Sequence, residues 1–288
     1  MYWSWGRESS FSNGNSTFFF HQNEWHSKKE TIILLHGFPD GPIVWGKLAE
    51  YFNEQFNIII PYLPGVHPQC SIDRKLSETF HLNILLLLKS DKRINGQVHL
   101  IGHDVGGVLV DQLSHLLGDK CSSVSFISTM GLNLYSKNLK IDQVIKSWYV
   151  PLFSTRIGQA LLRRSNAFGK KVLQKMDSTA IEAHVPDKLG SVKLYREFVN
   201  LLYQRTRWDR INRKKALFIF STEDPFVQIP AQKIIRAYYP NAEIRVQSGG
   251  HWEFCHRPEK FAELILNFTA SEKENINSLG EINESIEL

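Results

Sequence analysis

The sequence predicts an α/β protein: a mostly parallel β-sheet flanked by helices, with a helical cap inserted between two strands. Runs such as Thr31 to Leu35 and Asn57 to Ile60 are too uniformly apolar for half-exposed strands, which indicates strands covered on both faces. They alternate with helix-like stretches, an arrangement typical of parallel sheets with crossover helices. Between Ser128 and Ala216 the alternation stops, and only helix-like segments follow one another. This gap predicts the inserted cap.

The expected elements follow the chain in a simple order. Strands are expected at 18–21, 31–35, 57–60, 98–101, 123–128, 216–220 and 243–246, and core helices at about 43–52, 76–89, 108–117, 230–238 and 258–268. Cap helices are expected at 142–153, 157–164, 167–174 and 192–203. We therefore divide the chain into a core (1–132 and 213–270), a helical cap (133–212) and a polar, flexible tail (271–288).

Composition limits the class of protein. A chain of 288 residues with 42% hydrophobic residues suits one globular domain with an insertion. No apolar run approaches the ~20 residues needed to span a membrane, and Met1 to Asn15 has no signal-peptide pattern.

Three widely spaced cysteines indicate reduced thiols in a cytoplasmic protein. The net charge of +5 is concentrated in a basic stretch, Arg156 to Lys215, but no nucleic-acid motif accompanies it, so no nucleic-acid partner is expected. The sequence leaves the oligomeric state open.

The most informative stretch is His99 to Gly107, His-Leu-Ile-Gly-His-Asp-Val-Gly-Gly. It joins a predicted strand to a predicted helix, and Gly102 and Gly106 flank Asp104 with the spacing of a nucleophile elbow, G-x-Nu-x-G. Serine at the centre would indicate an esterase or lipase. Aspartate indicates a carboxylate nucleophile, which attacks saturated carbon and forms an alkyl ester. The alternatives are a simple helix N-cap or a phosphate loop, but the stretch lacks both G-x-G-x-x-G and a Lys-Ser/Thr pair.

An alkyl ester must then be hydrolysed, which needs a base to activate water and a group to orient the base. Asp224 follows the strand expected at 216–220, and His251 follows the last expected strand. The order nucleophile, acid, histidine is the order found in hydrolases with this elbow. Glu223 is the alternative acid, because a register error of one residue would exchange the two.

The oxyanion formed during ester hydrolysis needs backbone N–H donors. The residue after the nucleophile, Val105, is expected to supply one donor, and Phe38 in the loop His36-Gly-Phe-Pro39 the other. We expect His36 and His103 to be structural hydrogen-bonding residues beside the site rather than bases.

Together these motifs resemble the epoxide hydrolase and haloalkane dehalogenase group of α/β-hydrolases. The matching residues are His36-Gly-Phe-Pro39, Gly102 to Gly107, the turn at Asp224, and His251, and they span most of the chain. The resemblance implies the α/β-hydrolase fold, an Asp nucleophile, and a reaction that needs neither a metal nor an organic cofactor.

The resemblance also implies two cap tyrosines that protonate the epoxide oxygen, whose alkoxide is otherwise a strongly basic leaving group. Tyr149 and Tyr195 stand in segments similar to those that carry the two family tyrosines, and Tyr135 and Tyr203 are the alternatives. Val105 departs from the family pattern, because an aromatic residue usually follows the nucleophile.

The sequence thus favours an epoxide hydrolase that acts on a small hydrophobic electrophile. One alternative is a haloalkane or haloacid dehalogenase, in which Trp148 or Trp252 would hold the leaving halide. Val105 and Phe38 weaken it, since a dehalogenase of this group has a tryptophan and a polar residue at those two places. The other alternative is a ligand-binding protein that keeps the fold without turnover, against which the complete set of candidate catalytic residues argues.

Overall fold

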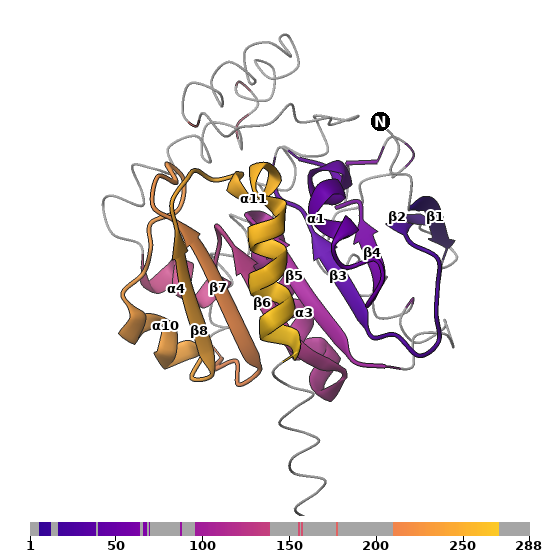
Figure 1. Ribbon diagram of the computed structural model, residues 1–288. Coiled ribbons are helices and arrows are strands. Elements are labelled where there is room, and N and C mark those ends of the chain that lie inside the picture. The colour runs from indigo at the N-terminus through magenta and orange to yellow at the C-terminus, as the bar shows by residue number, and fades with distance from the viewer. Residues whose placement is uncertain are drawn as a thin grey trace, which may run out of the picture.

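The computed structural model describes residues 6–12, 17–38, 40–63, 66–67, 69, 87, 96–138, 155, 157, 177 and 210–270 (Figure 1). These residues form one eight-stranded sheet with the strand order β1-β2-β4-β3-β5-β6-β7-β8. The strands are β1 (Arg7–Ser12), β2 (Thr17–Gln22), β3 (Thr31–Leu35), β4 (Asn57–Pro61), β5 (Val98–His103), β6 (Cys121–Ile127), β7 (Lys215–Ser221) and β8 (Ala242–Gln247). From β4 to β8 all neighbours are parallel, whereas β1 and β2 pair in antiparallel fashion at one edge.

The central strands are buried along their whole length. Every residue of β3, β4 and β5 is buried, as the unbroken apolar runs predicted. The seven expected strands are confirmed within one or two residues. Sequence reasoning missed β1, because Arg7–Ser12 is polar and largely exposed and lies at the edge of the described sheet, paired with β2. Such an edge strand has no apolar pattern to reveal it.

Helices cover both faces of the sheet. Helix 258–270 lies in front of the sheet in Figure 1, on the same side as α1 (Gly46–Glu50) and α11 (Glu253–His256). On the other face, α3 (Val105–Leu117) packs against β5, β6 and β3, and α10 (Gln232–Tyr238) packs against β8. Two further short helices, the 3₁₀ turn η1 (Pro42–Trp45) before α1 and η2 (Gly118–Lys120) after α3, complete this part of the chain.

The predicted helix at 43–52 is divided into η1 and α1, and α4 (Leu132–Lys137) was not expected as a helix. The four predicted cap helices lie outside the described residues, as do the tail at 271–288 and nearly all of the helix at 76–89. In the part of the chain that the structure describes, no helix combines the length and apolar character needed to cross a bilayer.

Candidate active site

The turn between β5 and α3 has the strained geometry that the elbow spacing predicted. Asp104 has φ 52° and ψ −125°, a conformation that non-glycine residues rarely adopt. It is held by bonds to its own carbonyl oxygen, which accepts from the Gly107 N–H at 3.0 Å and from the Thr129 hydroxyl at 2.5 Å. The strain therefore presents the Asp104 side chain at the carboxyl end of the central strand.

The two flanking glycines are explained by close packing. A Cβ added to Gly106 would lie 2.1 Å from the carbonyl oxygen of Leu35 in β3, and one added to Gly102 would lie 2.6 Å from the carbonyl carbon of Gly106. Both contacts are with backbone, which cannot move away as a flexible side chain can. Glycine at these two positions is what lets α3 begin directly against β3 and β5.

The two oxygens of the Asp104 carboxylate have different surroundings. Oδ1 accepts a hydrogen bond from the backbone N–H of Phe38 at 3.0 Å, and the backbone N–H of Val105 also bonds to the Asp104 carboxylate. Oδ2 lies 3.7 Å from Nε2 of His251. Oδ1 thus has one of the two donors expected of an oxyanion site, and Oδ2 faces a candidate base.

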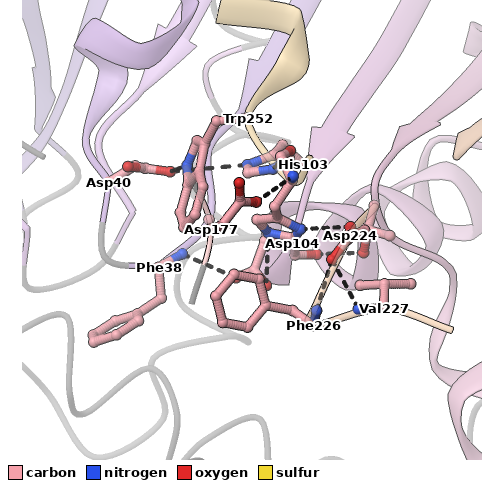
Figure 2. Close-up of polar contacts among 12 residues, drawn as sticks. Phe38, Asp40, His103, Asp104, Asp177, Asp224, Phe226, Val227 and Trp252 are labelled. Atoms are coloured by element: carbon pink, nitrogen blue, oxygen red, sulfur yellow. Dashed lines mark hydrogen bonds and ion pairs between the residues drawn. The ribbon is translucent and has the colours of Figure 1, made fainter. Parts of the chain in front are cut away.

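His251 and Asp224 form the closest ion pair of the site. Nδ1 of His251 lies 2.8 Å from Oδ2 of Asp224, and both side chains are buried (Figure 2). The other oxygen of Asp224 accepts from the backbone N–H groups of Phe226 and Val227 at 2.7 and 3.0 Å. Because Glu223 is exposed, the structure selects Asp224 of the two adjacent acids.

Charge and burial determine the protonation of these groups. Burial alone would lower the pKa of His251, but the charge and hydrogen bond of Asp224 and the charge of Asp104 raise it to about 9. Burial raises the pKa of the Asp104 carboxyl, although the neighbouring His251 opposes this. At neutral pH the ring of His251 is therefore an imidazolium in the resting site.

A second histidine–carboxylate pair lies behind His251. Nε2 of His103 donates to the carbonyl oxygen of His251 at 3.1 Å, and its Nδ1 lies 3.8 Å from Oδ2 of Asp40. That oxygen accepts a 2.8 Å hydrogen bond from the indole N–H of Trp252, and Figure 2 shows Asp40 and Trp252 together, away from Asp224. Burial lowers the pKa of His103 well below its ordinary value, so this ring is neutral.

His36 and His103 have the structural positions expected for them. His36 Nδ1 donates to the carbonyl oxygen of Gly37 at 2.9 Å, and its Nε2 accepts from the N–H of Leu63 at 3.2 Å. Since burial lowers the pKa of His36 to about 4, it is neutral and ties the loop after β3 to the end of β4.

Of the candidate proton donors, only Tyr135 lies among the described residues; Tyr149, Tyr195 and Tyr203 lie outside them. The Tyr135 hydroxyl is 3.4 Å from Oγ1 of Thr129, whose own proton goes to the Asp104 carbonyl oxygen. Burial and the nearby charge of Asp104 raise the pKa of Tyr135 further above its ordinary value, so the phenol keeps its proton.

Sequence reasoning missed two residues of this site, Asp40 and Asp177, and expected a different partner for a third, Trp252. Asp40 and Trp252 directly follow the loop motif and the histidine that it did identify, but their pairing joins residues 212 positions apart. Asp177, which accepts from the backbone N–H of His251 at 2.5 Å, has no motif around it at all. Trp252 was considered as a halide donor, but its N–H is directed to Asp40.

No group of three or more His, Cys, Asp and Glu side chains among the described residues is arranged to hold a metal ion. Among the described cysteines, Cys121 and Cys255 form no disulfide, and burial raises the pKa of the Cys255 thiol well above its ordinary value, which disfavours the reactive thiolate.

Comparison with known proteins agrees with this geometry at the level of the fold. A family model described as alpha/beta hydrolase fold matches residues 30–258. Monoacylglycerol lipase ABHD6 from Bos taurus is 22% identical over 270 residues, which cover 87% of this chain and 78% of that protein.

Solved structures give a similar result. The Cif epoxide hydrolase from Acinetobacter nosocomialis superposes with a TM-score of 0.78 at 15% identity, covering 93% of this chain and 90% of that chain. A putative epoxide hydrolase from Klebsiella pneumoniae superposes with a TM-score of 0.74 at 18% identity, covering 91% and 97%. At these identities the likeness establishes the fold, while the sequence relative and the structural neighbours carry names of different activities.

Proposed function

This chain belongs to the α/β-hydrolase fold family, and we propose that it is a hydrolase that opens epoxides to diols through an ester on Asp104. The observation that carries the proposal is the aspartate at the strained elbow, with Oδ1 held by the Phe38 N–H and Oδ2 facing His251. A carboxylate at this position is suited to attack on saturated carbon rather than on an acyl group.

In the first step Oδ2 of Asp104 attacks an epoxide carbon, and the ring C–O bond breaks. The electron pair goes to the epoxide oxygen, which takes a proton from a phenol. Tyr149 and Tyr195 are our proposed donors by resemblance, with Tyr135 as the alternative, because its hydroxyl is protonated and lies near Asp104. The product is a hydroxyalkyl ester of Asp104. The phenolate regains its proton from the His251 imidazolium by way of water, which leaves His251 neutral for the second step.

In the second step His251 takes a proton from water at Nε2, and the resulting hydroxide adds to the carbonyl carbon of the ester. The negative charge develops on Oδ1, which accepts from the N–H of Phe38 in the resting enzyme, and the N–H of Val105 is the second proposed donor. Collapse of this intermediate releases the diol, whose leaving oxygen takes the proton from His251, and leaves Asp104 as a carboxylic acid. Its proton then passes to His251, which restores the Asp104 carboxylate and the imidazolium. Asp224 holds the ring and stabilises its positive charge.

A lipase reaction, as the name of the sequence relative suggests, is less suited to this elbow. Attack of the Asp104 carboxylate on an ester carbonyl would have to expel an alkoxide, which is a far stronger base than the carboxylate. The attack would therefore reverse. A dehalogenase remains chemically close, since the same carboxylate can displace a halide, but the one described candidate for halide binding, Trp252, donates to Asp40.

The experiment that tests the proposal is intact-mass analysis of His251→Gln after incubation with pooled epoxides, pooled organohalides or a monoacylglycerol. Without its base the enzyme still forms the ester but hydrolyses it slowly, so the adduct accumulates. We expect a gain equal to the whole mass of an epoxide, located on the peptide that contains Asp104. A gain equal to an organohalide less the hydrogen halide would assign a dehalogenase, and glycerol release by the unaltered protein without an Asp104 adduct would assign a lipase.

A further inference from the structure

Asp177 is a buried carboxylate that contacts the main chain of the candidate base. Its side chain is 5% exposed, and its Oδ2 accepts the backbone N–H of His251 at 2.5 Å (Figure 2). In the sequence it stands 74 residues before His251, within the stretch predicted as the cap. A carboxylate is rarely buried unless a donor or a positive charge compensates it.

The loop that carries His251 is anchored from several directions. His103 donates to the carbonyl oxygen of His251, and Trp252 donates to Asp40, so two anchors come from the sheet side. The N–H of Gly250 lies 3.4 Å from Oε2 of Glu253, an anchor within the same segment. Asp177 is the anchor among the described residues that comes from the predicted cap. Its bond fixes the backbone of the very residue whose ring must turn toward Asp104.

Five titratable groups surround the His251 ring or its backbone. Asp224 bonds to Nδ1, Asp104 faces Nε2, Asp177 bonds to the backbone N–H, and His103 bonds to the backbone carbonyl. Asp40 lies behind His103 and is also close enough to interact with His251 electrostatically.

These groups differ in their effect on the pKa of His251. The charges of Asp224, Asp104 and Asp177 each raise its pKa. His103, being neutral, contributes no positive charge. The charge of Asp104 is lost when the ester forms. Of the three charges that raise the pKa of His251, those of Asp224 and Asp177 therefore remain during hydrolysis.

We propose that Asp177 is a positioning residue for ester hydrolysis: it holds the backbone of His251 so that Nε2 faces Asp104, and its negative charge stabilises the imidazolium that forms. The inference rests on the proposed two-step function. It assigns to the predicted cap a part in the second step that is separate from the protonation proposed for its tyrosines.

Three variants separate the two effects of Asp177. Asp177→Asn keeps an acceptor for the His251 N–H and removes the charge, whereas Asp177→Ala removes both. Asp119→Asn is the matched control, because Asp119 is fully exposed and its Oδ1 lies 3.5 Å from Nζ of Lys214. The titration of the His251 ring in each free protein, followed by NMR, needs no substrate and so reports on Asp177 even if the epoxide assignment fails.

We expect Asp177→Asn and Asp177→Ala to lower the pKa of His251 by on the order of one pH unit, and Asp119→Asn to leave it unchanged. The backbone amide resonance of His251 should move upfield in Asp177→Ala and much less in Asp177→Asn. In single-turnover measurements with an epoxide that forms the adduct, Asp177→Ala should slow ester hydrolysis about tenfold and ester formation less than twofold. Asp177→Asn should restore most of the hydrolysis rate and move its pH dependence to lower pH.

An unchanged His251 titration in both Asp177 variants would overturn the inference, as would equal slowing of both steps in Asp177→Ala, which is the signature of a purely structural role. If no epoxide forms an adduct with His251→Gln, the proposed function fails, and the NMR titration still decides whether Asp177 controls the base.

Discussion

Two buried histidine–carboxylate pairs are neighbours in this protein, and the pKa values of their histidines are shifted in opposite directions: that of His251 is raised and that of His103 is lowered. His251 and Asp224 are in hydrogen-bond contact at 2.8 Å, whereas His103 and Asp40 are 3.8 Å apart. The centroids of the two imidazole rings are only 4.5 Å apart. All four side chains are buried, so burial alone does not explain the difference.

The donors around each carboxylate explain it. Asp224 receives two backbone N–H groups on one oxygen and the His251 ring on the other. Asp40 receives the indole N–H of Trp252 on Oδ2, and its Oδ1 has no hydrogen-bond partner among the described residues. Consequently Asp224 supports a charged His251, while burial raises the pKa of Asp40 to about 7 and that of His103 is lowered. The comparison teaches that the donors around the carboxylate, more than residue type, determine which of the two histidines is charged.

The sharpest test of this comparison replaces each acid by its amide. Asp224→Asn leaves His251 without its charged partner and favours the wrong ring tautomer, so we expect ester hydrolysis to fall about 10⁴-fold. Asp40→Asn should change it less than tenfold. The measurement is the single-turnover decay of the Asp104 ester. Similar losses in the two variants would show that the pairs are functionally equivalent, contrary to their geometry.

The pH dependence of hydrolysis provides the second test. Hydrolysis needs neutral His251, so its rate should rise with pH as the ring loses its proton. The pKa is about 9 in the free enzyme, partly because of the Asp104 charge, and esterification removes that charge. We therefore expect the apparent pKa of the hydrolysis rate to lie on the order of one pH unit below the pKa of His251 in the free enzyme. NMR titration of the free protein gives the pKa of His251, and single-turnover rates give the apparent pKa of hydrolysis. His103 should show no titration in the pH range between these two pKa values.

Removal of the indole donor should destabilise the second pair in a pH-dependent way. Trp252→Phe deletes the hydrogen bond to Asp40, and the cost should be about 2 kcal/mol where Asp40 is charged. The bond lowers the pKa of Asp40, so the loss should grow as pH rises through about 7. Trp45→Phe is the matched control, because Trp45 is equally buried and its N–H has no partner among the described residues. Urea unfolding across pH should show a pH-dependent loss in the first variant alone.

The smallest expected effect is a gain in stability. The pKa of Asp40 is raised from 3.8 to about 7 by burial, so its contribution to folding becomes less favourable as pH rises through that interval. Asp40→Asn removes this dependence and can still accept from Trp252. We expect a gain of about 1 kcal/mol above pH ~7 that disappears near pH ~4. A loss of stability at high pH would mean that the Asp40 charge is well compensated after all.

The sequence predicted the parts of the site that depend on local geometry. The glycine spacing around Asp104 was readable because a strained turn needs residues without a Cβ at fixed offsets. The central strands β3, β4 and β5 were readable because burial on both faces demands continuous apolar residues. Residue roles in catalysis, including those of Tyr149 and Tyr195, stay predictions.

Other features depended on distances that no local pattern encodes. The choice of Asp224 over Glu223 follows from which of two adjacent side chains points into the core. Trp252 bonds to Asp40, 212 residues away, and His251 bonds to Asp177, 74 residues away. Each contact depends on the packing of segments that are far apart in the sequence. The amino-acid sequence by itself determined the fold and the strained turn at Asp104, because short-range sterics and hydrophobic periodicity specify both. Only the tertiary structure decided which carboxylates surround each histidine, because hydrogen bonding and charge act over a few ångströms between distant parts of the chain.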